Sequence, residues 1–214
     1  MTEQSTVRAD AFRRDGYVSG IQVLNPASLL GYRSRLMRFI DQYGEDPKFS
    51  DWTYVKTHLL CDWVMQMAHE PRIVGAVEEL VGADLLLWDS FLPLKQPRSH
   101  GYYGWHQDGT YWSVAPLDQI VTVWIALDDV DRENGAMQVI PGSHLAGQLA
   151  HIKTFDPSSK LRRGQELTGN IDFSQAVTLA LSPGQSSIHS PLVIHGSGPN
   201  LSDRYRLGIG LVYI

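Results

Sequence analysis

The pattern of hydrophobic and polar positions changes near residue 84. Before it, apolar residues recur at spacings of three and four, the period of an amphipathic helix. The pattern predicts one helix from Pro26 to Gly44, capped by Asn25, and a second from Pro71 to Gly82. After residue 84, short apolar runs alternate with Gly, Pro, Asp and Asn, which is typical of strands and turns.

The strand-like runs define the expected fold class. An early extended run starts at Tyr17, after a turn at Asp15-Gly16. The later predicted strands cover residues 85–88, 90–94, 102–106, 120–127, 136–140, 177–181, 186–189, 192–195 and 206–214. Many short strands between turns indicate a sandwich or barrel. We therefore predict an α+β, mainly β fold with one domain over 1–214, in which helical support (1–83) buttresses a β core (84–214).

Two segments fit neither pattern. Residues 51–67 mix aromatic and polar side chains, which favours an aromatic cluster packed under a loop over the mouth of a pocket. The polar insertion from Asp156 to Phe173 interrupts the β rhythm. A segment of this length between strands is either a mobile lid or an ordinary loop, and the sequence leaves both open.

Composition narrows the classes of function. The 214 residues are 43% hydrophobic, enough for one sizeable core, and the formal charge of −5 without a basic cluster argues against nucleic-acid binding. The single Cys61 cannot form an internal disulfide, and no apolar run approaches the roughly 20 residues of a membrane span. Residues 1–5 lack the pattern of a secretory signal, so we expect a reducing cytoplasm.

The candidate chemistry begins with His106 and Asp108. Alternate side chains of an extended backbone share a face, so both can point at one metal ion. Two histidines and one carboxylate bind Fe(II) and leave three coordination positions free, so a second histidine is needed. His195 is the candidate, at the end of an apolar run that breaks into Gly-Ser-Gly-Pro-Asn; His189 is its rival. Each residue alone has an ordinary structural interpretation.

Three motifs in this order resemble the phytanoyl-CoA dioxygenase family, a branch of the Fe(II)- and 2-oxoglutarate-dependent oxygenases that includes ectoine hydroxylase. They are Trp105-His106-Gln107-Asp108, then Asn134 to His144, then His195 to Asn200 with Arg206. The resemblance implies a double-stranded β-helix (a jelly-roll, cupin-like core) with the metal between its two sheets. It extends from about Phe12 to the C-terminus.

The resemblance also implies roles for individual residues. His106, Asp108 and His195 match the iron ligands, which would also serve as the catalytic centre. Arg206 matches the residue that binds the distal carboxylate of 2-oxoglutarate, for which a planar guanidinium is better suited than an amine. Ser197 and Trp124 match positions that flank this cosubstrate.

The family couples the use of O2 and 2-oxoglutarate, with release of succinate and CO2, to oxidation of a substrate C–H bond. We expect hydroxylation of a small metabolite, with secondary metabolism as one setting. Desaturation, cyclisation or epimerisation are alternative outcomes of the same chemistry. An intact Asp108 argues against halogenation, in which a small residue replaces the carboxylate. A rival of another class is a cupin-like metal-binding protein without turnover, which would have no need of Arg206.

The substrate itself cannot be identified from the sequence. Tyr103, Tyr111, Trp112 and His151 are candidates for the wall of the substrate pocket. The pair Arg162-Arg163 is weak evidence for a nucleotide phosphate, so the substrate could be free or bound to CoA or a carrier. Relatives often continue beyond the last barrel strand, whereas this chain ends at Ile214; the cover of the pocket and the oligomeric state stay open.

Overall fold

The computed structural model describes residues 3–44, 56–161, 164–169 and 171–214. Its α-helices are α1 (Glu3–Asp15), α2 (Pro26–Tyr43), α3 (Asp62–Ala68) and α4 (Pro71–Val81). Its 3-10 helices are η1 (Thr57–Leu59), η2 (Asp108–Tyr111), η3 (Leu117–Gln119), η4 (Ser143–Ala146) and η5 (Phe173–Gln175). Its strands are β1 (Tyr17–Gln22), β2 (Leu87–Phe91), β3 (Tyr103–His106), β4 (Val121–Ala126), β5 (Gln138–Val139), β6 (His151–Lys153), β7 (Gln165–Leu167), β8 (Val177–Thr178), β9 (Gln185–His189), β10 (His195–Ser197) and β11 (Gly208–Tyr213).

The two helices predicted from the apolar pattern, α2 and α4, are confirmed. The side-chain oxygen of Asn25 accepts hydrogen bonds from the backbone N–H groups of Ala27 and Ser28, both at 2.9 Å, which satisfies two free donors at the start of α2. Both helices have proline in the first turn. Each buries one apolar face against the same core cluster.

Helices α1 and α3 were not predicted, and here the pattern-based interpretation is wrong. Helix α1 has only a weak apolar stripe; Arg8 holds it to α4 through a 2.7 Å ion pair with Glu79. Helix α3 lies in the segment that we interpreted as a loop, and it buries Trp63 in the core. Of the other aromatic residues in that segment, Trp52 and Tyr54 lie outside the described residues.

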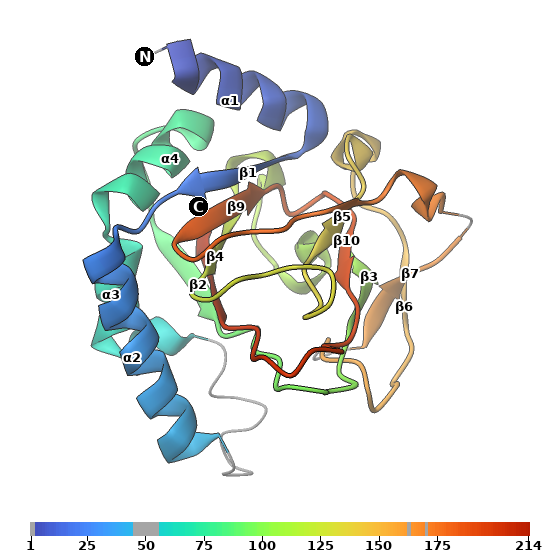
Figure 1. Cartoon of the computed structure of the whole chain (residues 1–214). Helices are drawn as coiled ribbons and strands as arrows, with labels where there is room; N and C mark the ends of the chain where they lie inside the picture. The colour runs from blue at the N-terminus through green and yellow to red at the C-terminus, as the bar shows by residue number, and fades with distance from the viewer. Residues whose placement is uncertain (1–2, 45–55, 162–163, 170) are drawn as a thin grey trace.

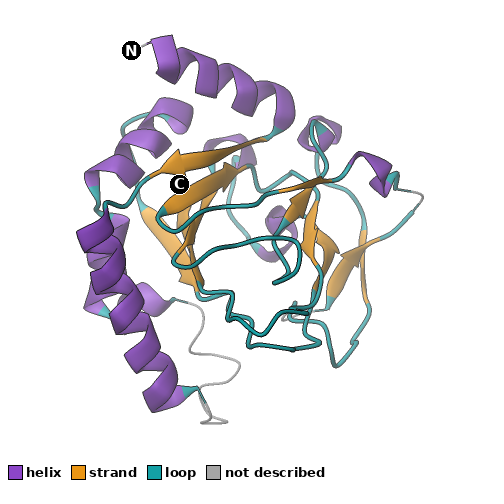
Figure 2. Cartoon of the chain, viewed as in Figure 1, coloured by secondary structure: helices purple, strands orange, loops and turns teal. Residues whose placement is uncertain are grey.

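Antiparallel strands form the centre of the molecule. A five-stranded sheet has the order β1-β9-β4-β11-β2, and a four-stranded sheet has the order β3-β10-β5-β8. Helices α2, α3 and α4 cover one face of the five-stranded sheet, while the four-stranded sheet lies on its other side (Figures 1 and 2). The early extended run at Tyr17 becomes β1, an edge strand that pairs with β9.

The alternation along β4 decides which residues reach the space between the sheets. Val121, Val123 and Ile125 belong to the cluster that packs against the helices. Side chains of a strand alternate between its faces, so Thr122 and Trp124 point the opposite way, toward the four-stranded sheet. All six residues of β4 are buried, because both faces of the strand are covered.

Strand β10 differs from its prediction. The sequence predicts an apolar strand that ends at His195, whereas β10 begins at His195. The chain turns at Ser190-Pro191 instead, where the N–H of Val193 donates to the carbonyl of Ser190 at 3.1 Å. Pairing with the segment of β5 begins only at Ile194, whose carbonyl accepts from the N–H of Ile140 at 2.9 Å. The polar insertion contains β7, which pairs with β6 in a separate two-stranded sheet. Within the described ranges, no helix combines the length and the apolar character needed to cross a membrane.

Candidate metal centre

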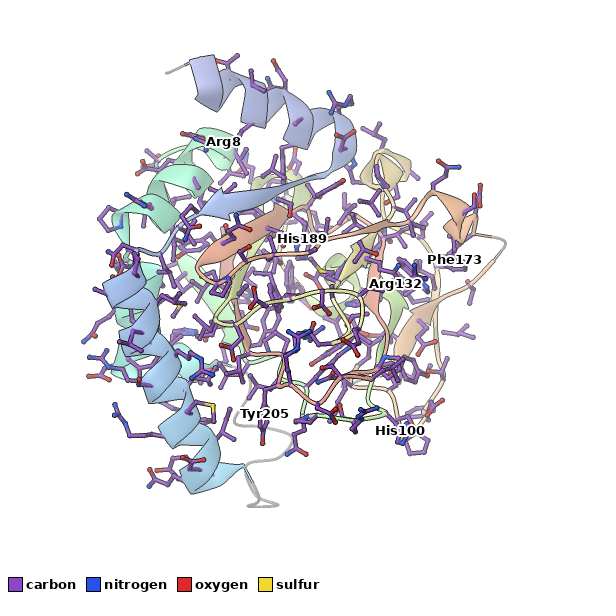
Figure 3. The ribbon with its side chains drawn as sticks, in the orientation of Figure 1. Arg8, His100, Arg132, Phe173, His189 and Tyr205 are labelled. Atoms are coloured by element: carbon purple, nitrogen blue, oxygen red, sulfur yellow. The ribbon has the colours of Figure 1, made fainter. Side chains whose placement is uncertain are left out.

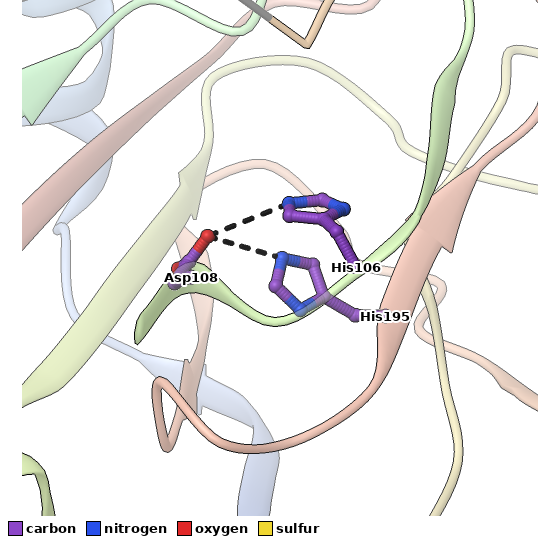
Figure 4. Close-up of side chains that lie close together, drawn as sticks. All are labelled: His106, Asp108 and His195. Carbon is purple, nitrogen blue, oxygen red and sulfur yellow. Dashed lines mark ion pairs between the residues drawn. The ribbon is translucent and has the colours of Figure 1, made fainter. Parts of the chain in front are cut away.

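The structure brings His106, Asp108 and His195 together between the two sheets (Figure 4). His106 and His195 are direct cross-strand partners on β3 and β10, and their ring centroids lie 4.1 Å apart. Asp108 starts η2, just past the end of β3. Its Oδ1 lies 3.5 Å from Nε2 of each histidine, and the three ligand atoms all fall within 4.8 Å of one another.

The hydrogen bonds of the two histidines fix which nitrogen faces the centre. Nδ1 of His106 lies 2.7 Å from the carbonyl of Gly104, and Nδ1 of His195 lies 3.1 Å from that of Val193. A carbonyl only accepts, so each Nδ1 carries a proton, and when the ring is neutral its Nε2 presents a lone pair to the centre. Two imidazole nitrogens and one carboxylate oxygen form a donor set that fits Fe(II) and leaves coordination positions open.

The second oxygen of Asp108 is held from the five-stranded sheet. Thr122 on β4 donates a 2.9 Å hydrogen bond to Oδ2, and Nε2 of His189 on β9 lies 3.3 Å from the same atom. Figure 3 shows His189 near the middle of the molecule, and it is almost fully buried. His189 is therefore directed at the oxygen that faces away from His106 and His195, and it supports the carboxylate rather than completing the group of three.

The electrostatics of the cluster suit a cation. Burial alone would raise the pKa of Asp108, but the charge of His195 and hydrogen bonds from the surrounding histidines lower that pKa well below its usual range. Burial lowers the pKa of His189 and also that of His106, where the charge of His195 adds to the effect. Burial would lower the pKa of His195 too, but Asp108 outweighs it and raises that pKa. A carboxylate that stays ionised in a buried position needs a positive partner.

Gln107, between the two residues of the His-x-Asp motif, ties the centre to its surroundings. It is fully buried; its Nε2 donates to the carbonyls of Gly147 and Leu192 at 2.9 and 2.6 Å, and its Oε1 accepts from the N–H of Leu149 at 2.8 Å. The bond to Leu192 joins this motif to the turn that leads into His195. The sequence motif did not indicate this role, because no spacing or neighbouring residue distinguishes Gln107 from an ordinary polar residue.

His151, a candidate for the substrate pocket, also supports this loop. Its Nδ1 lies 2.9 Å from the carbonyl of Leu149, and its Nε2 accepts from the backbone N–H of Gln107 at 3.1 Å. Burial lowers its pKa, which keeps the ring neutral as these bonds require. Both ring nitrogens are thus engaged within the protein, and the side chain links β6 to the loop that carries the candidate ligand Asp108.

Arg206 lies between β10 and β11 in the chain and contacts Ser197, two residues after His195. It is 2% exposed, and it donates from Nη1 to Ser197 Oγ at 2.7 Å and from Nη2 to the carbonyl of Pro93 at 2.7 Å. The ring of Trp124 lies 5.6 Å from its Cζ. Arg206, Ser197 and Trp124, the three residues that the resemblance assigned to the cosubstrate, therefore lie together. Nε of Arg206 has no hydrogen-bond partner among the described residues.

Lys95 was missed in the sequence. It is 1% exposed, it forms an isolated antiparallel bridge with Arg206, and its Nζ donates to Ser197 Oγ at 2.5 Å and to the carbonyl of Gly198. Burial, followed by the charges of Arg206 and Lys160, lowers the pKa of Lys95 to about 6. A lysine in a Leu-Lys-Gln-Pro loop looks like an ordinary surface residue, so only the fold reveals its position.

The other proposed pocket residues lie at different places around the centre. Tyr103 lies near Arg206, with its ring 5.9 Å from Cζ of that residue. Tyr111 packs edge-on to His106, at 5.9 Å between ring centroids, and its hydroxyl donates to the carbonyl of Gln165 at 2.9 Å. Trp112 follows η2 and is half-buried. Arg162 and Arg163 lie outside the described residues.

The chain is similar to several known oxygenases. L-proline trans-4-hydroxylase from Streptomyces griseoviridis is 29% identical over 159 residues, which is 67% of this chain and 59% of the relative. The solved structure of the non-heme monooxygenase ThoJ is 33% identical, with a TM-score of 0.81, and the match covers 96% of this chain and 76% of ThoJ. The epimerase SnoN, solved with Fe3+, alpha ketoglutarate and nogalamycin RO, is 25% identical, with a TM-score of 0.81 over 99% of this chain and 83% of SnoN.

These likenesses confirm the predicted double-stranded β-helix of the iron- and 2-oxoglutarate-dependent oxygenases. The chain spans about half the length of the curated relatives it matches. A family model described as phytanoyl-CoA dioxygenase (PhyH) matches residues 12–208, which is most of the chain. The chain therefore belongs to the phytanoyl-CoA dioxygenase family.

Proposed function

We propose that this protein is a 2-oxoglutarate-dependent oxygenase that hydroxylates a C–H bond of a small metabolite. The observation that carries the proposal is the convergence of His106, Asp108 and His195, with the buried Arg206 bonded to Ser197, two residues after His195. A barrel that only stored a metal would not need a buried guanidinium there. The hydroxylase outcome is favoured by the likeness to L-proline trans-4-hydroxylase.

The residues of the chain would divide the work as follows. Nε2 of His106, Nε2 of His195 and Oδ1 of Asp108 would hold Fe(II), while Thr122 and His189 keep Asp108 in one orientation through Oδ2. Arg206 would bind the distal carboxylate of 2-oxoglutarate with charge-assisted hydrogen bonds. Bound iron would supply the coupling of O2 reduction, decarboxylation of 2-oxoglutarate and oxidation of the substrate.

The proposal extends to the substrate and to the setting. Tyr111 and Trp112, which follow the metal-binding motif, would line the side of the pocket nearest His106. We propose a free small molecule rather than a CoA ester, a single oxygenase domain over 1–214 and a cytoplasmic location. The free thiol of Cys61 suits a reducing compartment.

The test is succinate formation under air with Fe(II) and 2-oxoglutarate, first alone and then with a panel of small metabolites. We expect slow succinate release alone and faster release with the substrate. The matched control is Arg206→Met, which should keep iron and lose most 2-oxoglutarate binding. If the intact protein neither binds 2-oxoglutarate nor releases succinate, a metal-binding protein without turnover is the better description.

A second outcome has one specific observation in its favour. SnoN, whose fold matches over nearly the whole chain, is described as an epimerase. The same residues could remove hydrogen from a substrate carbon without adding oxygen to it. Product analysis by mass spectrometry separates the two, because hydroxylation adds one oxygen atom and epimerisation leaves the mass unchanged.

A further inference from the structure

Strands β6 and β7 form a small unit that stands apart from the two large sheets. They pair with each other in a separate two-stranded sheet, which we call the insertion sheet. Gly147 before β6 has φ +71°, and Gly169 after β7 has φ +104°. A Cβ at either glycine would meet no atom of the described residues within 4 Å, its chain neighbours aside. Free space at both ends allows these glycines to act as hinges.

The first side of the insertion sheet is bonded to the segment that carries two of the candidate metal ligands. The N–H of Gln107 donates to Nε2 of His151 on β6 at 3.1 Å. The side chain of Gln107 donates to the carbonyl of Gly147 at 2.9 Å and accepts from the N–H of Leu149 at 2.8 Å. Gln107 lies between the two ligands in the chain, so a shift of this residue displaces both. The hinge at Gly147 is therefore tied to the candidate metal centre.

Strand β7 contacts the same segment. The hydroxyl of Tyr111 donates to the carbonyl of Gln165 at 2.9 Å, while its ring packs edge-on to His106. The carboxyl group of Glu166 fills the space where a Cβ on Gly104 would lie. The carbonyl of Gly104 in turn accepts the Nδ1 proton of His106 at 2.7 Å. Both strands of the insertion sheet thus contact the segment from 104 to 111.

A bound metal ion and the insertion sheet restrict the same part of the chain. The ion requires His106 and Asp108 to lie at fixed distances from His195, on a different strand. The hydrogen bonds from β6 and β7 require the segment from 104 to 111 to lie in the same place. When two events each order one segment, the first to occur lowers the entropy cost of the second.

We propose that metal binding and closure of the insertion sheet are coupled, so that each favours the other through the segment from 104 to 111. The inference rests on the metal binding of the proposed function and adds a regulation of the same site. Tyr111 contacts both His106 and β7, so the closed sheet covers the side of the centre on which we propose the substrate pocket. The metal-free protein has a looser pocket wall, and loading with Fe(II) closes it.

The test compares amide hydrogen exchange, followed by mass spectrometry, in the metal-free and the anaerobic Fe(II)-loaded protein. We expect Fe(II) to slow exchange by about tenfold in peptides that cover 147–153 and 165–169, within the ~5–150-fold range that is usual for coupled sites. His151→Phe keeps an aromatic ring but accepts no hydrogen bond, and it should lose most of this slowing. Its Fe(II) affinity should fall by a similar factor, because coupling is reciprocal.

Three further variants separate coupling from a general loss of packing. Ile152 lies on β6 next to His151, is 55% exposed and faces the other way, so Ile152→Ala should keep both the slowing and the Fe(II) affinity. His151→Gln restores an acceptor near the position of Nε2 and should recover most of both effects. Tyr111→Phe keeps the ring beside His106 and removes the hydroxyl bond to Gln165. It serves if His151→Phe does not fold, and it should reduce both effects by a smaller factor.

The outcomes distinguish the two proposals. Absence of Fe(II) binding by the wild type would contradict the proposed function itself. Fe(II) binding with unchanged exchange in the insertion sheet would overturn the inference alone, and would mean that the sheet is docked independently of the metal. Slowing that persists in both His151→Phe and Tyr111→Phe would overturn it as well, and so would an equal loss of slowing in Ile152→Ala.

Discussion

The two sheets contribute different things to the same site. The four-stranded sheet, whose strands are two to four residues long, carries His106 and His195. The five-stranded sheet has two central strands of six fully buried residues, and it contributes Thr122 and His189, which hold Asp108. The short strands therefore present the two candidate histidine ligands, and the five-stranded sheet fixes the orientation of the third candidate, Asp108. Substitutions in the two sheets should accordingly fail in different ways.

The largest expected effect is on metal binding by the four-stranded sheet. His195→Ala removes one of three candidate ligands, and we expect Fe(II) affinity to fall by more than about 100-fold, beyond the ~10–100-fold cost of losing a partner outside the ligand set. Anaerobic Fe(II) titration and metal content after gel filtration measure it. The control is His189→Ala, which should retain iron. Retention by His195→Ala together with loss by His189→Ala would make His189 the third ligand.

The next effect is on the free energy of unfolding, which should fall by different amounts when a leucine is truncated in the apolar cluster of each sheet. Leu211 on β11 is fully buried in the large cluster under the helices, whereas Leu179 is 4% exposed in a small cluster beside β5. Leucine-to-alanine changes in cores cost about 2–5 kcal/mol. We expect Leu211→Ala near the upper end of that range and Leu179→Ala near the lower end, because a small cluster at the edge can close over the cavity.

Urea unfolding of the two leucine variants measures this difference, provided that the slope of each transition is unchanged. Folded Leu211→Ala should still bind Fe(II) with nearly wild-type affinity, since its side chain faces the helices. Equal losses of stability in the two variants would contradict the division between a scaffold sheet and a ligand-bearing sheet.

A smaller effect tests the contact between the sheets. His189→Gln and Thr122→Val each loosen Oδ2 of Asp108, and we expect Fe(II) affinity to fall by about tenfold, the low end of the range for such partners. The control is Ser187→Ala, because Ser187 is buried on the same strand as His189 and makes no bond to Asp108. An equal loss of affinity in Ser187→Ala would show that β9 matters only through packing.

The sequence predicted the candidate ligands better than their supports. His106 and Asp108 are neighbours in a motif, and His195 follows in another, so their types and order carried the signal. The contacts of Lys95, Gln107 and His189 join residues 40 to 103 positions apart in the chain, which no local pattern encodes. The supports of the site therefore became visible only with the fold.

The fold shows the same division. Helices α2 and α4 were predicted because each has a clear apolar face and end signals. Helix α1 is largely polar and α3 has only seven residues, so tertiary contacts rather than periodicity define them. The start of β10 was misplaced because the apolar run at 192–194 resembles a strand, although the turn at Pro191 delays pairing until Ile194.

The last effect concerns the stability of the region around Lys95 and Arg206, and it is seen only as a dependence on pH. The pKa of Lys95 is lowered to about 6 from its ordinary value near 10.4, so between these pH values the folded protein binds fewer protons than the unfolded chain. Stability should then rise with pH through that window, with a contribution from Lys95 of at most about 1.4 kcal/mol per pH unit. Lys95→Met should remove this contribution. Its free energy of unfolding, relative to that of the wild type, should therefore be higher at pH 6.5 than at pH 8.5. Urea unfolding of both proteins at the two pH values measures it, and parallel pH profiles would mean that Lys95 is charged in the folded state.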